Sequence, residues 1–179
     1  HSQSNSGNVN TENVGGGIFA GFTNVTGTKN TYVGGNAGFG SASGRNSNNV
    51  GIGYNALLDV STGSSNVAIG KEAGCVMTSG TRNVLLGANA GDAITSGSYN
   101  VALGFNVDVA SATGNTQLAI GCAASNWITG DSSFNVCLAG STIKAMASGG
   151  IFCATSFVGS GANLTGINAG FDPDSQENL

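Results

Sequence analysis

The side chains that most often carry chemistry are few in this chain of 179 residues, and they form no catalytic pattern. The single histidine is His1, so no serine–histidine–aspartate or cysteine–histidine arrangement can be drawn within an ordered fold. The cysteines have no CxxC spacing and no histidine partner for zinc. We expect them to be reduced and buried as small apolar side chains. They are Cys75, Cys122, Cys137 and Cys153.

Carboxylates offer no better candidate for catalysis or metal binding. A glycosidase needs two carboxyl groups about 5 to 9.5 Å apart across a cleft, and a metal array needs acidic residues that recur at a fixed spacing. The acidic residues instead occupy variable positions: Asp59, Glu72, Asp92, Asp108 and Asp131. "DPD" at 172–174 could touch a cation, but its polar setting favours a turn or linker. We therefore expect no enzyme, no cofactor and no metal site.

Composition narrows the function further. The chain has 31 glycines, one proline, 8% charged residues and a net charge of −4. Its five basic residues are scattered, which argues against a nucleic-acid partner. Membrane insertion is not expected either, because no apolar run approaches the roughly 20 residues that span a bilayer. The chain starts without methionine or a signal-peptide pattern, so we expect a fragment or a processed product.

The elements that must position any functional residue come from an internal repeat. "NVAIGKEAGCVMTSGTR" (66–82) is followed at once by the similar "NVLLGANAGDAITSGSY" (83–99). Repeats begin at Asn13, Asn30, Asn49, Asn66, Asn83, Asn100, Gln117 and Asn135, mostly 17 residues apart. Seventeen residues are too few for a helical repeat, which takes about 33. The pattern predicts an all-β, parallel β-solenoid of about eight rungs over residues 13–140, with glycines at the corners and asparagines stacked as an amide ladder.

Strand alternation suggests which side chains form the core. The two aliphatic residues of "NVAIG" are two apart and point to one side, and we expect this pair to face the interior. The expected core columns include Val67, Ile69, Val84, Leu86, Val101, Leu103, Leu118 and Ile120. The residues between them would then point outward: Gly15, Tyr32, Gly51, Ala68, Leu85, Ala102, Ala119 and Cys137. Because most are small and apolar, we expect that face to be covered by other copies in a homotrimer.

Trp127, the only tryptophan, lies where the repeat lengthens to 18 residues. One interpretation makes it a stacking platform for a host glycan. The other, which the neighbouring Ile128 favours, makes it a plug over the end of the stack.

At the level of the family, the stretch "NVAIGKEAGCVMTSGTRNVLLGANAGDAITSGSYNVALG", with "NTQLAIGCAASNWITGDSSFNV" after it, resembles repeats in tail-fibre and other structural proteins of marine tailed phages, particularly cyanophages. It is also similar to the shorter "VAIG" head repeats of trimeric autotransporter adhesins. "ATSFVGSGANLTGI" (154–167) is similar to a segment common in those phage fibres. The resemblance covers 13–167, and the 17-residue period favours the phage side.

The resemblance implies a homotrimeric virion fibre, such as a tail fibre, made in the host cytoplasm. Its expected partners are other virion proteins and a host cell-surface glycan or protein. One alternative is a trimeric bacterial surface adhesin. A minor alternative is a monomeric ice-binding solenoid, suggested by a hydroxyl column of Thr26, Ser43, Thr62, Ser79, Ser96 and Thr113. Around the rungs we expect a polar leader (1–12), a small β module or irregular rungs (141–167), and a linker or the start of a next repeat (168–179).

Overall fold

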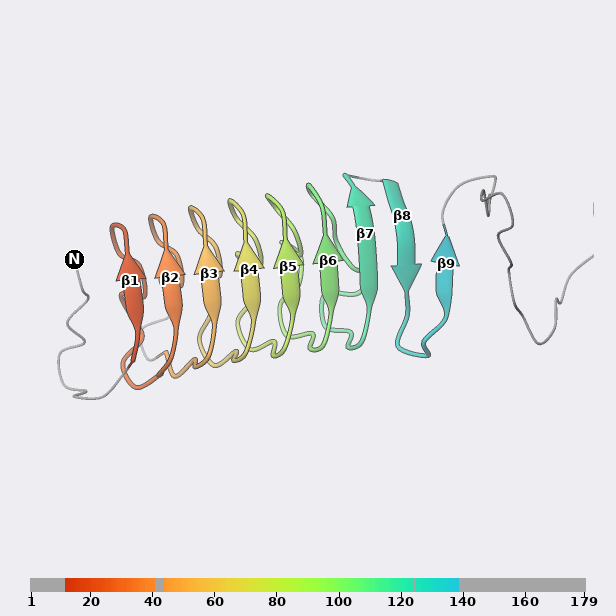
Figure 1. Ribbon diagram of the computed structural model, residues 1–179. Helices are drawn as coiled ribbons and strands as arrows, with labels where there is room; N and C mark the ends of the chain where they lie inside the picture. The colour runs from red at the N-terminus through yellow and green to blue at the C-terminus, as the bar shows by residue number, and fades with distance from the viewer. Residues whose placement is uncertain (1–11, 41–43, 124, 139–179) are drawn as a thin grey trace, which may run out of the picture. The chain divides into compact units, whose positions relative to one another are not determined.

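The computed structural model describes residues 12–40, 44–123 and 125–138, all within the first of the two units into which the chain divides, His1–Ile143 and Lys144–Leu179. The leader before Glu12 and the segments 141–167 and 168–179 lie outside the described residues. The described part forms one sheet (Figure 1). Its strands are β1 (Val14–Gly16), β2 (Thr31–Val33), β3 (Val50–Ile52), β4 (Val67–Ile69), β5 (Val84–Leu86), β6 (Val101–Leu103), β7 (Leu118–Cys122), β8 (Ser125–Gly130) and β9 (Val136–Leu138).

Strands β1 to β7 are parallel, and each pairs with the equivalent strand of the next rung. Between β4 and β5, for example, Val67 lies beside Val84 and Ile69 beside Leu86. The chain coils about six times, and the six turns lie side by side behind the strands in Figure 1. The predicted parallel β-solenoid with 17-residue rungs is confirmed.

A glycine directly after each of the strands β1 to β6 allows the sharp first corner of the rung. Gly70 has a φ of 139°, which L-amino acids with a side chain rarely adopt. A Cβ built on Gly70 would also fall on the carbonyl oxygen of Gly87 in the next rung. The equivalent glycines in the other rungs have φ between 128° and 135°. This corner therefore requires glycine for both its backbone angle and its closeness to the next rung.

The asparagines that start the rungs form the predicted amide ladder, and those from Asn30 to Asn100 are fully buried. The Oδ1 of Asn66 accepts hydrogen bonds from the backbone N–H and the Nδ2 of Asn83, both at 3.0 Å. The Nδ2 of Asn66 also donates to the carbonyl oxygen of Gly80 at 2.8 Å, across the coil of its own rung. Equivalent bonds continue to Asn100 and Gln117. The ladder is confirmed, and it satisfies polar groups that burial would otherwise leave unpaired.

The prediction of which strand residues face the core is wrong. Ala68, Leu85 and Ala102 are fully buried, whereas Ile69 and Leu86 are 40% and 38% exposed. The other predicted core residues are half-buried: Val67, Val84, Val101, Leu103, Leu118 and Ile120. The reason is the ladder itself. Since Asn66 points inward to bond its neighbours, alternation turns Val67 outward, Ala68 inward and Ile69 outward.

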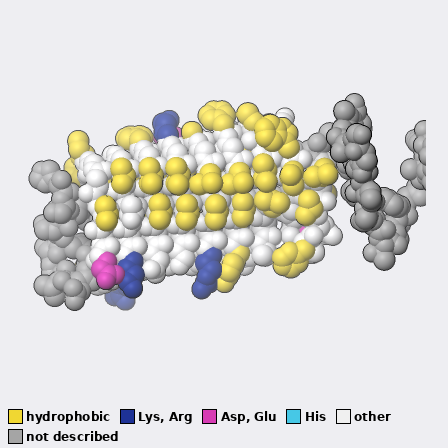
Figure 2. Space-filling view, in the orientation of Figure 1, with side chains coloured by type: hydrophobic (Ala, Val, Ile, Leu, Met, Phe, Trp, Pro, Cys, Tyr) yellow, Lys and Arg dark blue, Asp and Glu magenta, His cyan; other side chains and the backbone are white. Residues whose placement is uncertain are grey.

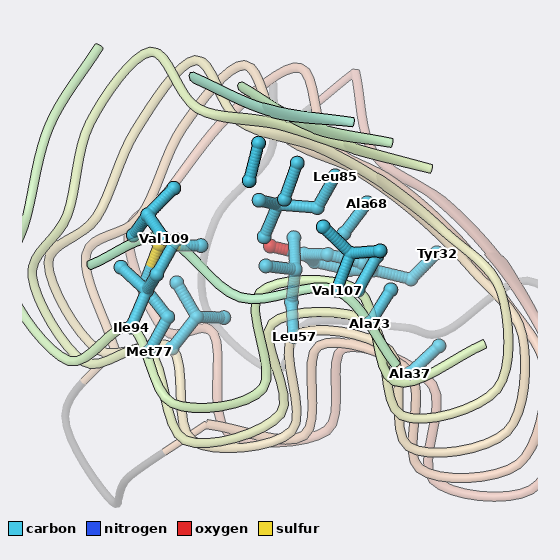
Figure 3. Close-up of a cluster of buried hydrophobic side chains, with 14 of the residues drawn as sticks. Tyr32, Ala37, Leu57, Ala68, Ala73, Met77, Leu85, Ile94, Val107 and Val109 are labelled. Carbon is cyan, nitrogen blue, oxygen red and sulfur yellow. The ribbon is translucent and has the colours of Figure 1, made fainter. Parts of the chain in front are cut away.

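The interior is narrow, and it is filled by a few large side chains beside small ones. Leu57, Met77, Leu85 and Ile94 are fully buried and point into the middle of the coil (Figure 3). In the early rungs Tyr32 fills the space beside Gly51, where an added Cβ would lie 2.9 Å from the ring. The small residues at this strand position therefore reflect limited interior volume.

The regular coil ends at β7, which corrects the prediction of rungs up to residue 140. Strand β8 pairs with β7 in the antiparallel direction, and β9 pairs with β8 in the same way. Asp131 holds the turn between them, because its Oδ1 accepts from the backbone N–H of Ser133 and Asn135 at 2.9 and 3.0 Å. The "NV" at Asn135 thus begins a hairpin strand rather than an eighth rung.

Candidate interaction surface

Two outward columns of aliphatic side chains run along the sheet. In β1 to β7 the first residue of the strand belongs to one column and the third residue to the other, and all of these are aliphatic except Gly16 and Thr31. In the third-residue column Val33 and Ile52 are 42% and 37% exposed, close to the values for Ile69 and Leu86. Figure 2 shows both columns as parallel rows of hydrophobic side chains over the strands. The residues that sequence analysis assigned to the core thus form the main exposed surface of the sheet.

The columns continue past the last rung onto the antiparallel strands. The register places Ile128 of β8 and Leu138 of β9 in line with Ile120, and Val136 in line with Leu118 through Gly130. Leu138 and Val136 are 46% and 62% exposed. We call this nine-strand surface the aliphatic strip. The alternation of Val136 and Leu138 in the sequence predicts that they continue the two columns, but as core residues of a further rung. Ile128 was not predicted to belong to them, because the hairpin breaks the repeat.

The strip is about as large as the largest apolar patch on a typical single chain, and such patches are often functional. At about 4.8 Å between strands, nine strands make it roughly 38 Å long. Two columns with their side chains are about 10 Å wide, so the strip covers about 400 Å². A continuous apolar patch of that size marks an interaction site in many proteins. A stable contact takes about 800 Å² from each partner, so the margins of the strip must contribute as well.

Polar and mixed side chains line both margins of the strip. The leading margin comprises the residues two positions before each of the first seven strands: Glu12, Lys29, Asn48, Ser65, Arg82, Tyr99 and Thr116. The trailing margin comprises the residues two positions after the third residue of β1 to β6: Ile18, Gly35, Tyr54, Lys71, Ala88 and Phe105. Figure 2 shows charged side chains beside the hydrophobic rows rather than within them.

The charged groups at the margins form only weak contacts within the chain. Lys29 lies 3.8 Å from Glu12 and Lys71 lies 3.1 Å from Glu72, and exposed pairs of this kind add little stability. The Nη1 of Arg82 donates to the hydroxyl oxygen of Tyr99 at 2.6 Å. The guanidinium carbon of Arg82 also lies 5.2 Å from the Tyr99 ring centroid. These side chains lie along the margin and leave the strip itself uncharged.

A second cluster of chemical interest lies on another side of the coil. Asp92 and Asp108 occupy neighbouring rungs, and the Oδ1 of Asp108 accepts the backbone N–H of Ala93 at 3.1 Å. Partial burial, together with Asp92, raises the pKa of Asp108 to about 6. Burial and the nearby Asp92 also raise the pKa of the Cys75 thiol. A thiol with a raised pKa is a poor nucleophile at neutral pH, so this cluster does not suit covalent catalysis.

A third cluster consists of aromatic rings on the first two rungs. Phe22 and Phe39 stack with centroids 5.7 Å apart, and Phe19 meets each of them edge-on at 5.4 and 6.1 Å. Inside the same rungs the amides of Asn24 and Asn46 are buried beside apolar residues such as Tyr32. The rings therefore add apolar contacts on the outside of rungs whose interior includes buried amides.

Trp127 does not plug the end of the coil. It lies in β8 and is 63% exposed. The cysteines also differ from expectation, since Cys75 is half-buried while Cys122 and Cys137 are exposed and unpaired. Cys153 lies outside the described residues, as does Ser43 of the hydroxyl column; Thr26, Thr62, Ser79, Ser96 and Thr113 are exposed.

The described residues contain no group of three histidine, cysteine, aspartate or glutamate side chains placed to hold a metal ion. Within the same part of the chain, no helix has the length and apolar character needed to span a bilayer.

Comparison with protein-family models, with curated proteins and with solved structures finds no match. What the geometry establishes is a β-solenoid repeat protein with rungs of 17 residues. The aliphatic strip and the resemblance of the repeats are the two features that bear on its function.

Proposed function

We propose that the chain is a non-enzymatic structural segment of a bacteriophage virion fibre, a tail fibre or similar appendage, that assembles as a homotrimer. In this proposal it is made in the host cytoplasm and functions in the virion. There it contacts other virion proteins and contributes to attachment to a glycan or protein of the host surface.

The aliphatic strip is the observation that carries the proposal. A single coil of this width cannot fold over its own sheet, so the exposed valine, isoleucine and leucine side chains need a partner surface. Other copies of the chain carry such a surface, and closed cyclic symmetry is the usual way in which identical chains cover one another. Burying most of about 400 Å² of apolar surface would contribute roughly 10 kcal/mol per copy before the costs of association.

The oligomeric state tests the proposal directly. Sedimentation equilibrium of the purified chain should give a mass near three times the chain mass of 17.5 kDa. A folded monomer over the whole concentration range would overturn it, because the strip would then be stable in water.

A strip variant and a matched control test whether the chains associate through the aliphatic strip. Ile69→Lys combined with Leu86→Lys places two charges on exposed strip positions, and we expect the mass to fall to that of one chain with an unchanged circular dichroism spectrum. The control Val76→Lys adds a charge to the same rung at a residue that is 36% exposed but lies outside the strip. It should leave the mass unchanged.

Attachment is tested separately, with the fluorescently labelled chain and candidate host cells. Saturable binding that Trp127→Ala weakens at least fivefold would support a host contact at β8. Binding that is equal for Trp127→Ala would place the contact elsewhere on the fibre.

Two alternatives share parts of this evidence. A trimeric bacterial adhesin would use the same strip, and the neighbouring genes distinguish it: tail genes support the fibre, while a signal peptide and membrane anchor in the full gene support the adhesin. An ice-binding solenoid would use the exposed hydroxyl column. However, the neighbouring hydroxyls of Ser61 and Thr78 already donate to backbone carbonyl oxygens of the next rung. A thermal hysteresis measurement decides this case.

A further inference from the structure

Resting on the proposed self-association, we infer that the copies pack parallel and in register around an axis along the stack. In this arrangement the leading margin of one copy meets the trailing margin of the next at the same rung. The partner is a second copy of this chain. The inference specifies which residues meet across the contact.

The first step is geometric. In any closed ring whose symmetry axis is parallel to the stack, equivalent residues of all copies lie at one height. The two margins flank the same strand of each rung, so a leading residue meets the trailing residue of its own rung in the neighbouring copy. A shift by one rung would not close the ring and would produce an open helical filament.

Second, the backbone holds the residues of the leading margin in one repeated conformation. Its seven residues all have left-handed backbone, with φ from 47° to 61°. The backbone N–H of Arg82 donates to the carbonyl oxygen of Ser64 at 3.1 Å, and that of Tyr99 to Thr81 at 2.9 Å. This repeated conformation points successive side chains outward at the spacing of the rungs. The margin can therefore match a second row that has the same spacing.

The third step is the complementarity of residues on the same rung. The two long cations of the leading margin are placed opposite the two smallest trailing residues: Lys29 opposite Gly35, and Arg82 opposite Ala88. At the sixth strand Tyr99 is placed opposite Phe105, which gives an aromatic pair. The two cations thus meet small side chains, the two rings meet each other, and no like charges meet.

If the neighbouring copy is shifted by one rung, so that each leading residue faces the trailing residue of the preceding rung, this match is lost. Arg82 would then face Lys71, and the like charges would repel each other. Tyr99 would face Ala88 and lose its aromatic partner. A shift in the other direction pairs Arg82 with Phe105, but it requires the open filament described above. Closure and side-chain size together favour the same-rung arrangement.

Cysteine cross-linking tests the register. In a background with the four native cysteines replaced by serine, Ser65→Cys with Lys71→Cys places thiols on the two margins of one rung. Within one chain they are separated by six residues of mostly extended backbone, roughly 20 Å, which is far beyond the 7 Å limit for a disulfide. Any disulfide therefore joins two copies. The matched control, Ser65→Cys with Ala88→Cys, is shifted by one rung.

Mild oxidation of the same-rung variant should give covalent dimers and trimers on a non-reducing gel, at least tenfold faster than the control. Faster cross-linking of the shifted control would overturn the register. An absence of cross-links in a sample that sediments as a trimer would overturn the contact between margins while leaving the proposed function intact. A reduced sample that sediments as a monomer would instead count against the proposed function.

Discussion

At the residue scale, neighbouring glycines at one corner have different roles. Gly34 has a φ of 131°, and a Cβ on it would lie 2.5 Å from the carbonyl oxygen of Gly53. Gly35 has no such angle, and a Cβ there would meet only the Tyr54 side chain at 3.4 Å. Gly34→Ala should therefore lower the free energy of unfolding by more than about 2 kcal/mol. Gly35→Ala should change it by less than about 1 kcal/mol. Urea denaturation of both variants measures the difference, and equal losses would contradict this account of the corner.

Also at the residue scale, the carboxyl group of Asp108 makes the free energy of unfolding depend on pH. Partial burial and the neighbouring Asp92 raise its pKa from 3.8 to about 6 in the folded chain. The folded state thus binds the proton more tightly than the unfolded state does. The Asp108 carboxyl group therefore contributes its full stabilisation of the fold below pH 3.8. This stabilisation is lost as the pH rises through about 6. Because the group is partly exposed, we expect the loss to be about 1 kcal/mol.

Asp108→Asn tests this contribution. The amide oxygen can still accept the backbone N–H of Ala93, while the charge beside Asp92 is removed. The variant should be more stable than the native chain at pH 7.5 and similar to it at pH 4. Urea denaturation across this range measures both values. A variant that follows the native pH profile would show that another group causes the dependence. Asp92→Asn removes the neighbouring charge and should reduce the effect without abolishing it.

At the element scale, one strand presents two leucines to different surroundings. Leu85 is fully buried in the coil, whereas its neighbour Leu86 lies on the aliphatic strip and is 38% exposed. Leu85→Ala should cost about 2 to 5 kcal/mol of unfolding free energy, because it leaves a cavity in a narrow core. Leu86→Ala should cost less than about 1 kcal/mol in the isolated chain, and should instead weaken association. Denaturation of dilute chain and sedimentation at rising concentration separate the two effects. If Leu86→Ala lowered the free energy of unfolding more than Leu85→Ala, Leu86 would be the core residue, as the sequence pattern suggested.

This strand shows what the sequence could predict. The repeat length, the strand at each "NVAIG", the glycine corner and the asparagine ladder all follow from local patterns, and the structure has them. The direction of the strand faces does not follow from the aliphatic pair alone, since alternation defines two sides without saying which one is inside. Burial of Asn66 decides it, because the amide must reach both Asn83 and Gly80. An asparagine ladder placed inside the coil would have predicted Ala68 and Leu85 as core.

The hairpin of β8 and β9 was harder to foresee for a different reason. The "NV" at Asn135 resembles the start of a rung, and only one residue of extra spacing marks the change. The antiparallel turn depends on Asp131, whose side chain bonds Ser133 and Asn135. A turn that depends on one aspartate side chain is difficult to predict from the sequence of a repeat, because a single residue is its only mark. The sequence pattern therefore placed Val136 and Leu138 in the right columns but assigned them to the core of an eighth rung, whereas they are exposed on the hairpin.

At the scale of the whole molecule, the amide ladder and the parallel sheet form a stack that could in principle continue. Each rung offers the next one the same backbone groups and the same side-chain columns. Within the part of the chain that the structure describes, β7 is the last parallel strand, and β8 covers its edge with reversed direction. An exposed parallel edge pairs readily with another chain, so proteins usually cover or disrupt such edges. The hairpin therefore does two things: it lengthens the aliphatic strip and it ends the stack.

Truncation separates these two roles. A chain that ends at Cys122 keeps β1 to β7 but exposes the β7 edge, on which β1 of another copy could dock in the parallel direction. We expect this variant to form end-to-end assemblies that grow with concentration, seen as rising sedimentation coefficients and light scattering. A chain that ends at residue 140 keeps β8 and β9 and serves as the control for loss of the C-terminal unit. It should keep a fixed size, because the reversed β8 does not offer the pairing pattern of a parallel rung. Equal growth of both variants would mean that the hairpin does not limit stacking, and that the strip alone determines how these chains assemble.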